Sequence, residues 1–364
     1  MKILLCVIFL AAFFSMQITA IPFLPGVGGK PSEADRKDYL QRAENFDGKE
    51  FHNENEVVFI NKVQDEDPLR ISAKPAKPED SLELPVKTPE FLTSPSERDF
   101  TFTWYGHSTF MIQMHGKNIL IDPVFTERIS PVSWAGPKKF TKPSVGTEDL
   151  PEIDFLVLSH DHYDHLDYKF IREIDEKVKK YIVPLGVESH LKKWKVKTEK
   201  IINLSWWEEF SEDGLKITAA PAQHFSGRWI TGRNQTLWCG YVFKDEYRQI
   251  FYSGDSGYGE HFKKIHEKFG DFELAILECG QYNKRWPMIH SFPEETVQEA
   301  MELGAKITVP VHWGAIVLST NGWDDSVLRF VKAAEQNGID YLTPYLCETV
   351  KFPLTKSYKE KWFE

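Results

Sequence analysis

Cysteine is scarce in this sequence: there are 4 in 364 residues, and one of them, Cys6, lies within the first 20. The others, Cys239, Cys279 and Cys347, are far apart and do not form the paired spacings of a zinc finger. This number and spacing exclude a disulfide-rich scaffold, so a hydrophobic core must hold the fold together. We expect the three later cysteines to be buried and to behave as small apolar residues.

Positive charge is not in excess either. The chain has 44 Lys and Arg against 54 Asp and Glu, which gives a formal net charge of −10. Nucleic-acid-binding surfaces need clustered positive charge, so this balance argues against a nucleic-acid partner. There is also no collagen-like period, coiled-coil heptad run or low-complexity tract. Hydrophobic residues make up 41% of the chain, which is ordinary for a globular protein with a sizeable core.

Long apolar runs are absent after the first 20 residues. At the N-terminus, Lys2 precedes an unbroken apolar run from Ile3 to Phe14, and polar residues lead from there to Ala20. This layout is typical of a secretory signal peptide, and the run is too short to cross a bilayer core comfortably, which takes about 20 residues. We expect residues 1–20 to direct export, with cleavage after Ala20 giving a secreted or periplasmic protein. An uncleaved segment would instead anchor the chain to a membrane.

The rest of the chain divides into three parts. Residues 21–97 are rich in Lys, Glu, Asp and Pro and are interpreted as an extended N-terminal arm, with regular structure beginning near Phe100. From 98 to 355, apolar segments of strand character alternate with segments of helical spacing, and residues 356–364 form a C-terminal tail. This alternation predicts one α/β domain with sheets inside and helices outside.

The expected strands are short and apolar, and the expected helices are amphipathic. We expect strands at 100–106, 109–114, 119–125, 153–160, 181–184, 215–224, 236–243, 248–255, 272–280 and 306–314. We expect helices at 167–180, 186–194, 258–270, 293–305 and 323–338. A glycine between the second and third strands predicts a hairpin turn.

Potential metal ligands gather directly after one of the apolar segments. In the run HDHYDH at 160–165, four such side chains lie within six residues. A short irregular loop can point His160 and His162 at one metal ion while Asp164 and His165 face a second. Three further candidates, His224, Asp255 and His312, each end an apolar strand. A lone histidine there is more often structural, but beside such a cluster it becomes a credible ligand. Imidazole and carboxylate groups are the ligands of catalytic zinc, and this set also suits manganese or iron.

The order of these motifs resembles a known family. An H-x-H-x-D-H run followed by a histidine, an aspartate and a histidine at strand ends is similar to the metal-site pattern of the metallo-β-lactamase fold hydrolases, over about 98–352. The segments LSHDHYDHLD, PAQHFSGRW, YSGDSGYGEHF and VPVHWG resemble the branch of N-acyl-phosphatidylethanolamine-hydrolysing phospholipase D and its bacterial relatives. The resemblance implies an α/β fold, an αββα four-layer sandwich with two central mixed sheets.

The resemblance also implies two divalent metal ions, zinc in the first place, held by seven ligands in two groups that share one aspartate. The first group is His160, His162 and His224, the second is Asp164, His165 and His312, and the shared ligand is Asp255. A hydroxide bridging the two ions would attack phosphorus or a carbonyl carbon. Catalytic roles would fall to Asp164, Asp255 and His290, the last by binding a phosphoryl oxygen or protonating the leaving group.

Two more side chains match the family's motifs near the metal site. Asp122 and His107 would support the ligand loop at 160–165 from behind. His115, His261 and His266 have no such context, and we expect them to face solvent.

The stretch that precedes His290 departs from the phospholipase. Glu278 and Cys279 stand where the lipid enzyme is apolar, and we expect this change to alter the substrate mouth and leave the metals alone. Arg228 and Arg233 are candidates to receive a phosphate or to pair with surface acids.

The predicted function is a metal-dependent hydrolase that cleaves a phosphodiester, with a glycerophospholipid as the expected substrate. The predicted partners are a small-molecule or phospholipid substrate and a peripheral contact with a membrane, which place the protein in lipid metabolism. One alternative is a lactonase or ester hydrolase on the same site. The other is a metal-binding, non-catalytic envelope protein that retains the fold.

Overall fold

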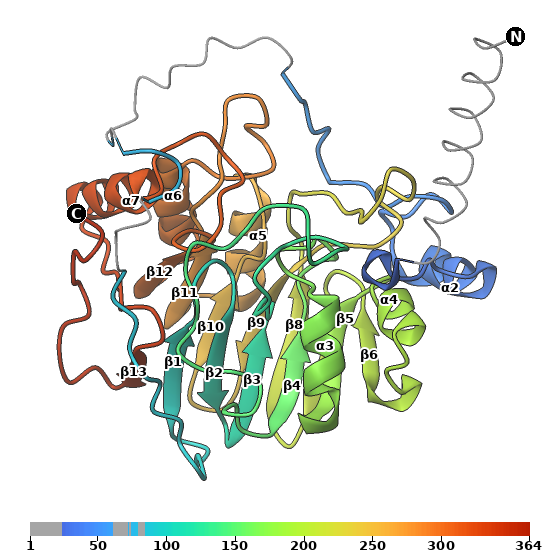
Figure 1. Ribbon diagram of the computed structural model, residues 1–364, viewed down its shortest axis with the longest axis horizontal. Helices are drawn as coiled ribbons and strands as arrows, with labels where there is room; N and C mark the ends of the chain where they lie inside the picture. Colours follow the sequence, from blue (N-terminus) through green and yellow to red (C-terminus); the bar gives the residue numbers. More distant parts are fainter. Residues whose placement is uncertain (1–23, 61–71, 73, 79–83) are drawn as a thin grey trace, which may run out of the picture.

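The computed structural model describes residues 24–60, 72, 74–78 and 84–364 of the chain. The predicted signal segment at 1–20 lies outside these residues. Two β-sheets form the centre of the molecule (Figure 1). The larger sheet has the strand order β13-β1-β2-β3-β4-β5-β6, and the smaller has the order β12-β11-β10-β9-β8-β7.

The strands are short, as expected from their apolar segments. Those of the larger sheet are β1 (Phe100–Trp104), β2 (Phe110–Met114), β3 (Lys117–Ile121), β4 (Ile153–Val157), β5 (Val178–Pro184), β6 (Ile201–Leu204) and β13 (Thr349–Phe352). Those of the smaller sheet are β7 (Glu209–Glu212), β8 (Leu215–Ala220), β9 (Gly240–Lys244), β10 (Gln249–Tyr252), β11 (Leu274–Glu278) and β12 (Ile307–Val311). The sequence did not predict β6, β7 and β13, which have only 4 residues each.

The helices flank the two sheets. They are α2 (Glu33–Arg42), α3 (Tyr168–Ile174), α4 (Glu188–Lys193), α5 (His261–Phe269), α6 (Pro293–Glu302) and α7 (Asp325–Asn337). The helix predicted at 167–180 is shorter than expected, because Val178 pairs with Ile153 of β4 and the chain continues as strand β5. Within the described residues, no helix is long and apolar enough to cross a membrane.

Both sheets are mixed. In the larger sheet, β13, β1, β2 and β3 pair antiparallel, whereas β3, β4, β5 and β6 pair parallel. In the smaller sheet, β10, β11 and β12 are parallel and β7 to β10 are antiparallel. Helices lie in the connections between the parallel strands, except between β3 and β4, where the chain is irregular. Because these strands are parallel, their carboxyl ends meet at one edge of each sheet.

The β2–β3 hairpin shows how local sequence directs pairing. Met114 lies opposite Lys117, so only His115 and Gly116 form the turn. Both have positive φ, 52° and 69°, as a two-residue type I′ turn requires. Glycine adopts this conformation without steric cost, and the predicted hairpin with glycine in its turn is confirmed.

Three apolar layers hold the sheets and helices together. The largest cluster lies between the sheets and includes Phe102 and Ile112 of one sheet and Ile217 and Tyr241 of the other. A second cluster packs α3 and α4 on the outer face of the larger sheet, and a third packs α5 and α6 on the smaller sheet. The predicted αββα arrangement with two mixed central sheets is therefore confirmed (Figure 1).

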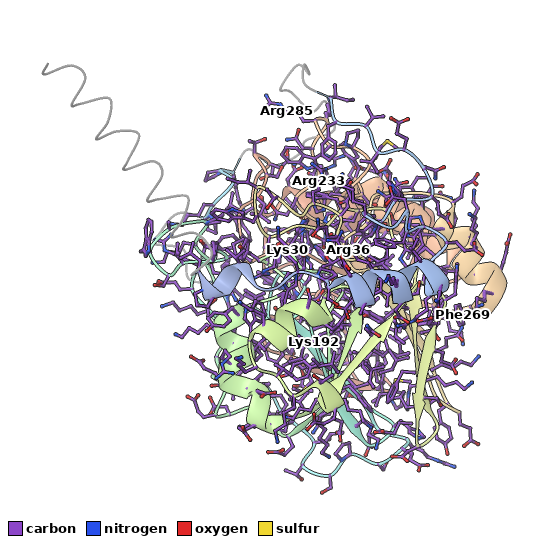
Figure 2. The ribbon with its side chains drawn as sticks, turned by 90° about the vertical axis from the view of Figure 1, so that its right-hand side faces the viewer. Lys30, Arg36, Lys192, Arg233, Phe269 and Arg285 are labelled. Carbon is purple, nitrogen blue, oxygen red and sulfur yellow. The ribbon has the colours of Figure 1, made fainter. Side chains whose placement is uncertain are left out.

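The N-terminal arm contains a helix that the sequence did not predict. Helix α2 starts after Ser32, whose hydroxyl accepts from the backbone N–H of Asp35 while that carboxylate accepts from the Ser32 N–H, a capping box. Tyr39 of α2, with Phe46 and Phe51, packs on Trp238 of the domain. Figure 2 shows Arg36 of α2 and Lys192 of α4 on the same face of the molecule. The arm is thus packed on the domain through this cluster.

The C-terminal tail also packs on the domain. Trp362 stacks on Trp313 with ring centroids 5.2 Å apart, and Phe363 meets the same ring edge-on at 5.6 Å. Phe363 is fully buried. Because Trp313 follows His312, the tail covers the end of β12 that carries a predicted ligand.

Substitution of Phe51 tests whether the arm folds with the domain. Phe51 is fully buried, so Phe51→Ala should lower the free energy of unfolding by about 3–5 kcal/mol. Leu40→Ala is the matched control on α2, because Leu40 is 54% exposed and should cost no more than about 0.5 kcal/mol. Urea unfolding measures both. A cost for Phe51→Ala equal to that of the control would contradict this packing.

Candidate metal centre

The seven predicted ligands lie where strands of both sheets end. The loop at 160–165 follows β4 in the larger sheet. In the smaller sheet, His224 follows β8, Asp255 follows β10 and His312 follows β12 directly. The packing of the two sheets brings these ends together, so residues far apart in the chain reach one region.

The first predicted group of three histidines converges on one point. His160 Nε2 lies 2.9 Å from His162 Nδ1, and His224 Nε2 lies 3.2 Å from the same atom. A single proton cannot satisfy both contacts. Two nitrogens bound to a tetrahedral zinc at about 2.0–2.1 Å lie about 3.3 Å apart, close to what is observed. The spacing therefore suits ligands of one metal ion.

The second group contains the three predicted residues and one more. Ligand atoms of Asp164, His165, His312 and His107 all lie within 4.8 Å of one another. His165 Nε2 is 3.6 Å from Asp164 Oδ2, and His107 Nε2 is 2.9 Å from the same oxygen. His107, predicted to support the loop from behind, thus contacts the carboxylate of a candidate ligand directly.

Asp255 lies between the two groups. Its Oδ2 is 3.8 Å from His160 Nε2 and 3.7 Å from His224 Nε2 in the first group. In the second group, the same oxygen is 3.1 Å from His165 Nε2, and Oδ1 is 3.1 Å from His312 Nδ1. One carboxylate can therefore reach cations on both sides, as a bridging ligand does.

Several atoms that face this region are buried without partners. His165 Nε2, His312 Nε2 and Asp255 Oδ1 make no hydrogen bond within the described part of the chain. A buried polar atom without a partner costs about 1–3 kcal/mol. Cations bound among these atoms would remove that cost, so the donor set fits two divalent ions with nitrogen and oxygen ligands.

The environment of the site favours neutral imidazole rings at three histidines and ionised carboxylates at two aspartates. Burial lowers the pKa of His160, His224 and His312 well below its usual value, so each ring keeps a lone pair for a cation. Burial would raise the pKa of Asp164 and Asp255, but the neighbouring charge of His165 lowers the pKa of both. The carboxylates therefore stay ionised at neutral pH.

Asp122 supports the ligand loop, in the position predicted for it. Its Oδ2 accepts hydrogen bonds from His165 Nδ1 at 2.8 Å and from the Tyr252 hydroxyl at 2.6 Å. Its Oδ1 accepts from the Ser159 backbone N–H at 2.7 Å. With Nδ1–H donated to Asp122, Nε2 is the nitrogen of His165 that faces Asp255 and the site.

The backbone is in an unusual conformation at three of these positions. His107, Asp122 and His312 have φ values of 53°, 41° and 69°, in the left-handed region that non-glycine residues rarely adopt. Such strain costs of order 1–3 kcal/mol per residue and gathers at functional sites. The pairing of His107 with Trp313, which follows His312, holds two of these positions together.

His290 lies beside two of the predicted metal ligands. Its ring centroid is 5.1 Å from that of His224 and 5.2 Å from that of His312. Glu278 contacts it: Oε1 lies 3.1 Å from His290 Nδ1. Burial raises the pKa of Glu278 to about 7, and this carboxyl helps to raise the pKa of His290 against the effect of burial. Glu278 is only 1% exposed, so it does not itself line a substrate mouth, and its effect on that mouth stays a prediction.

Sequence reasoning missed a contribution from the arm. Asn53 donates through Nδ2 to the carbonyl of His224 at 2.7 Å and accepts from the His224 N–H at 3.0 Å. Its Oδ1 also accepts from Trp238 Nε1 at 2.9 Å. An asparagine in a polar segment carries no signal for such a role.

Arg228 is not available to receive a phosphate. Its guanidinium is buried and donates to the backbone carbonyls of Gly26, Asp161 and Leu166. It therefore ties the arm to the ligand loop. Arg233, by contrast, lies over the rings of Phe225 and Phe59, at 4.6 and 5.2 Å from their centroids.

Two histidines expected to face solvent are buried. His261 Nε2 lies 3.0 Å from the hydroxyl of Ser256, next to Asp255. His115 Nε2 lies 2.7 Å from the carbonyl oxygen of Asp213. The partner of His261 lies across a loop, and the partner of His115 lies in a distant segment of the chain. The hydrophobic periodicity of the sequence does not reveal such partners. His266 is 39% exposed, as predicted.

A cavity of about 400 Å³ opens beside the first ligand group. Its wall includes His224, the apolar side chains of Val57, Phe59 and Phe225, and Arg233. Figure 2 shows Arg233 on the same face as Lys30 of the arm. The cavity thus combines apolar surface with one guanidinium next to a candidate metal ligand.

The chain is similar to several known proteins. The family model of the β-lactamase superfamily domain matches residues 117–313. A protein of Mycobacterium tuberculosis described as uncharacterized is 36% identical over 277 residues, which cover 75% of this chain and 73% of that protein. The N-acyl-phosphatidylethanolamine-hydrolyzing phospholipase D 1 of Caenorhabditis elegans is 37% identical over 238 residues, 62% of this chain and 67% of the enzyme.

Solved structures share the fold. A metallo hydrolase from Ignicoccus hospitalis superposes with a TM-score of 0.54 at 19% identity and covers 71% of this chain and 100% of its own. At that identity, the likeness concerns the fold alone. The family match and the relatives at 36–37% identity show the family to which the chain belongs. The chain therefore belongs to the β-lactamase superfamily domain family, the family of metal-dependent hydrolases with the metallo-β-lactamase fold.

Proposed function

We propose that this protein is a hydrolase that holds two divalent cations, with zinc as the first expectation, and cleaves a phosphodiester bond of a glycerophospholipid. The observation that carries the proposal is the position of Asp255, whose carboxylate lies 3.1–3.8 Å from ligand atoms of both groups. A shared carboxylate is typical of sites that hold two cations about 3.5–4 Å apart for in-line displacement.

Each group of side chains has a separate task. Two cations held here would supply Lewis acidity toward the phosphoryl group and lower the pKa of water. The His107 ring contacts Oδ2 of Asp164. No described residue forms a hydrogen bond with the other oxygen, Oδ1. This oxygen is therefore placed to orient the attacking water. His290 donates a proton to the leaving oxygen as the P–O bond breaks.

The surroundings of the site support an amphipathic, anionic substrate. The cavity beside His224 offers apolar side chains for acyl groups and the Arg233 guanidinium for a phosphate. No described residue forms a salt bridge with Arg233, so its charge is available. The name of the Caenorhabditis elegans relative, a phospholipase D, agrees with this substrate class.

Loss of the shared ligand should remove metal and activity together. Asp255→Asn leaves one fewer charge between the two groups, so we expect fewer than two bound ions per molecule and a matching loss of hydrolysis. Metal analysis by mass spectrometry after equilibration with zinc measures the first effect. Asp271→Asn is the control, because Asp271 is an exposed carboxylate on a loop. A variant that keeps two ions would contradict the bridging role.

Arg233 should separate phosphodiesters from neutral esters. Arg233→Met keeps the aliphatic length but loses the charge, so KM for N-acyl-phosphatidylethanolamine should rise by roughly tenfold, about 1.4 kcal/mol, while hydrolysis of a lactone should not change. Kinetics on both substrates, with release of phosphatidic acid as the readout, test this. Wild-type protein that cleaves lactones but no phosphodiester would favour the lactonase alternative.

Removal of the His290 ring should affect turnover more than binding. His290→Ala should keep both metal ions and lower kcat on a phosphodiester by roughly 10²–10⁴, the usual effect of a positioned acid or base. His266→Ala is the control, since that ring is exposed and distant from the ligands in the chain. Normal turnover in His290→Ala would exclude this histidine from the mechanism.

A further inference from the structure

Glu278 is a buried carboxyl group with two defined partners. It ends β11, is 1% exposed and lies at the edge of the candidate metal centre. Its Oε1 is 3.1 Å from His290 Nδ1. Its Oε2 accepts a hydrogen bond from the backbone N–H of Ser256 at 3.2 Å. Ser256 follows Asp255, so the side chain connects His290 to the segment that carries the shared ligand.

One of these two partners has a fixed role in its hydrogen bond, and the other does not. The Ser256 N–H can only donate, so the oxygen facing it must accept. An ionised carboxylate accepts at its second oxygen as well, and the His290 Nδ1 atom opposite that oxygen must then carry a hydrogen. An ionised Glu278 therefore fixes a neutral His290 imidazole in the tautomer with hydrogen on Nδ1.

The opposite ring nitrogen is then left for the reaction. No hydrogen bond to His290 Nε2 exists among the described residues, and the side chain is 12% exposed. One ring nitrogen of His290 lies within 4.8 Å of ligand atoms of His224 and Asp255. The ring therefore lies at the metal centre while its Nδ1 edge is held from behind.

We propose that Glu278 is the positioning residue of His290: it holds Nδ1–H so that Nε2 is presented to the leaving-group oxygen. This inference rests on the proposed function for the role of Nε2. In the step concerned, the P–O bond of the leaving group breaks and its oxygen takes the proton from Nε2. The ring is left neutral with its hydrogen on Nδ1, and Nε2 regains a proton from solvent. Glu278 remains a hydrogen-bond acceptor throughout.

Replacement of this carboxylate by an amide gives a specific outcome. In Glu278→Gln, the amide oxygen must face the Ser256 N–H, because two donors cannot face each other. The NH₂ group then faces His290 Nδ1, which must become an acceptor, so the hydrogen moves to Nε2. In serine proteases, the equivalent change from carboxylate to amide behind the catalytic histidine costs about 10⁴ in kcat through the wrong tautomer.

The tautomer is measured directly, without reference to activity. Long-range ¹H–¹⁵N spectra of the metal-loaded protein, with His290 assigned from His290→Ala, should show hydrogen on Nδ1 in the wild type and on Nε2 in Glu278→Gln. Glu299→Gln is the matched control, because Glu299 is equally buried but bonds to Ser291 and not to the His290 ring. All variants should keep two metal ions. A wild-type ring without hydrogen on Nδ1, or an unchanged tautomer in Glu278→Gln, would overturn the inference.

Kinetics then test what the position of the ring is for. A poor leaving group, such as the alkoxide of an N-acylethanolamine headgroup or a simple alkoxide, needs protonation, whereas p-nitrophenolate leaves without it. We expect Glu278→Gln to lower kcat by roughly 10²–10⁴ for alkyl phosphodiesters, with little change in KM, and by less than tenfold for bis-p-nitrophenyl phosphate. Equal losses on both substrates would contradict a role through His290.

The two proposals fail in distinguishable ways. If wild-type protein with two ions cleaves no phosphodiester, the proposed function is wrong, but the tautomer spectra still decide whether Glu278 holds Nδ1–H. If phosphodiesters are cleaved and Glu278→Gln behaves like Glu299→Gln in both measurements, only the positioning role is lost.

Discussion

The carboxylate of Asp255 between two groups of buried imidazoles is the interaction on which the centre of this protein depends. Its oxygens approach nitrogens from β4, β8 and β12, so elements of both sheets meet at one side chain. Burial lowers the pKa of His160, His224 and His312, so these three imidazoles are poor bases and keep their lone pairs free. A set of converging acceptors is unfavourable by itself, and cations are the partners that make it favourable. The folded chain thus brings carboxylate oxygens and imidazole nitrogens together in one buried region.

The two sheets are also joined behind the ligands. Tyr252 of β10 donates to Asp122, which follows β3, and Tyr241 of β9 donates to the carbonyl of Leu158 at 2.8 Å. These bonds cross the interface between the sheets where the ligand loop begins. They fix the position of the ligand loop relative to Asp255. Both tyrosine side chains are buried in the core, so the hydroxyl groups are held in place. The strained backbone at Asp122 and His312 is stabilised by the same surroundings.

The arm takes part in the architecture of the site. The side chain of Asn53 forms hydrogen bonds with both the N–H and the carbonyl of His224. The guanidinium of Arg228 donates to the carbonyl of Gly26 in the arm, and also to the carbonyls of Asp161 and Leu166. The arm, which is far away in sequence, therefore contacts both His224 and the ligand loop at 160–165. The same segment supplies Val57 and Phe59 to the wall of the cavity beside His224. In this way, the arm affects both the geometry of the ligands and the shape of the space available to a substrate.

The αββα arrangement was expected from the resemblance to a family. The sequence by itself determined the α/β class, the order of most strands and helices, and the candidate ligands. These follow from local properties: apolar segments of fixed length, and ligand-type side chains directly after them. The hairpin at His115 and Gly116 was also predicted locally, from a glycine between two apolar segments. Only the tertiary structure decided that Val178 begins a strand, that α2 packs on Trp238, and that Glu278 faces His290. Each of these depends on a partner distant in the chain, and neither propensity nor spacing carries information about such a partner.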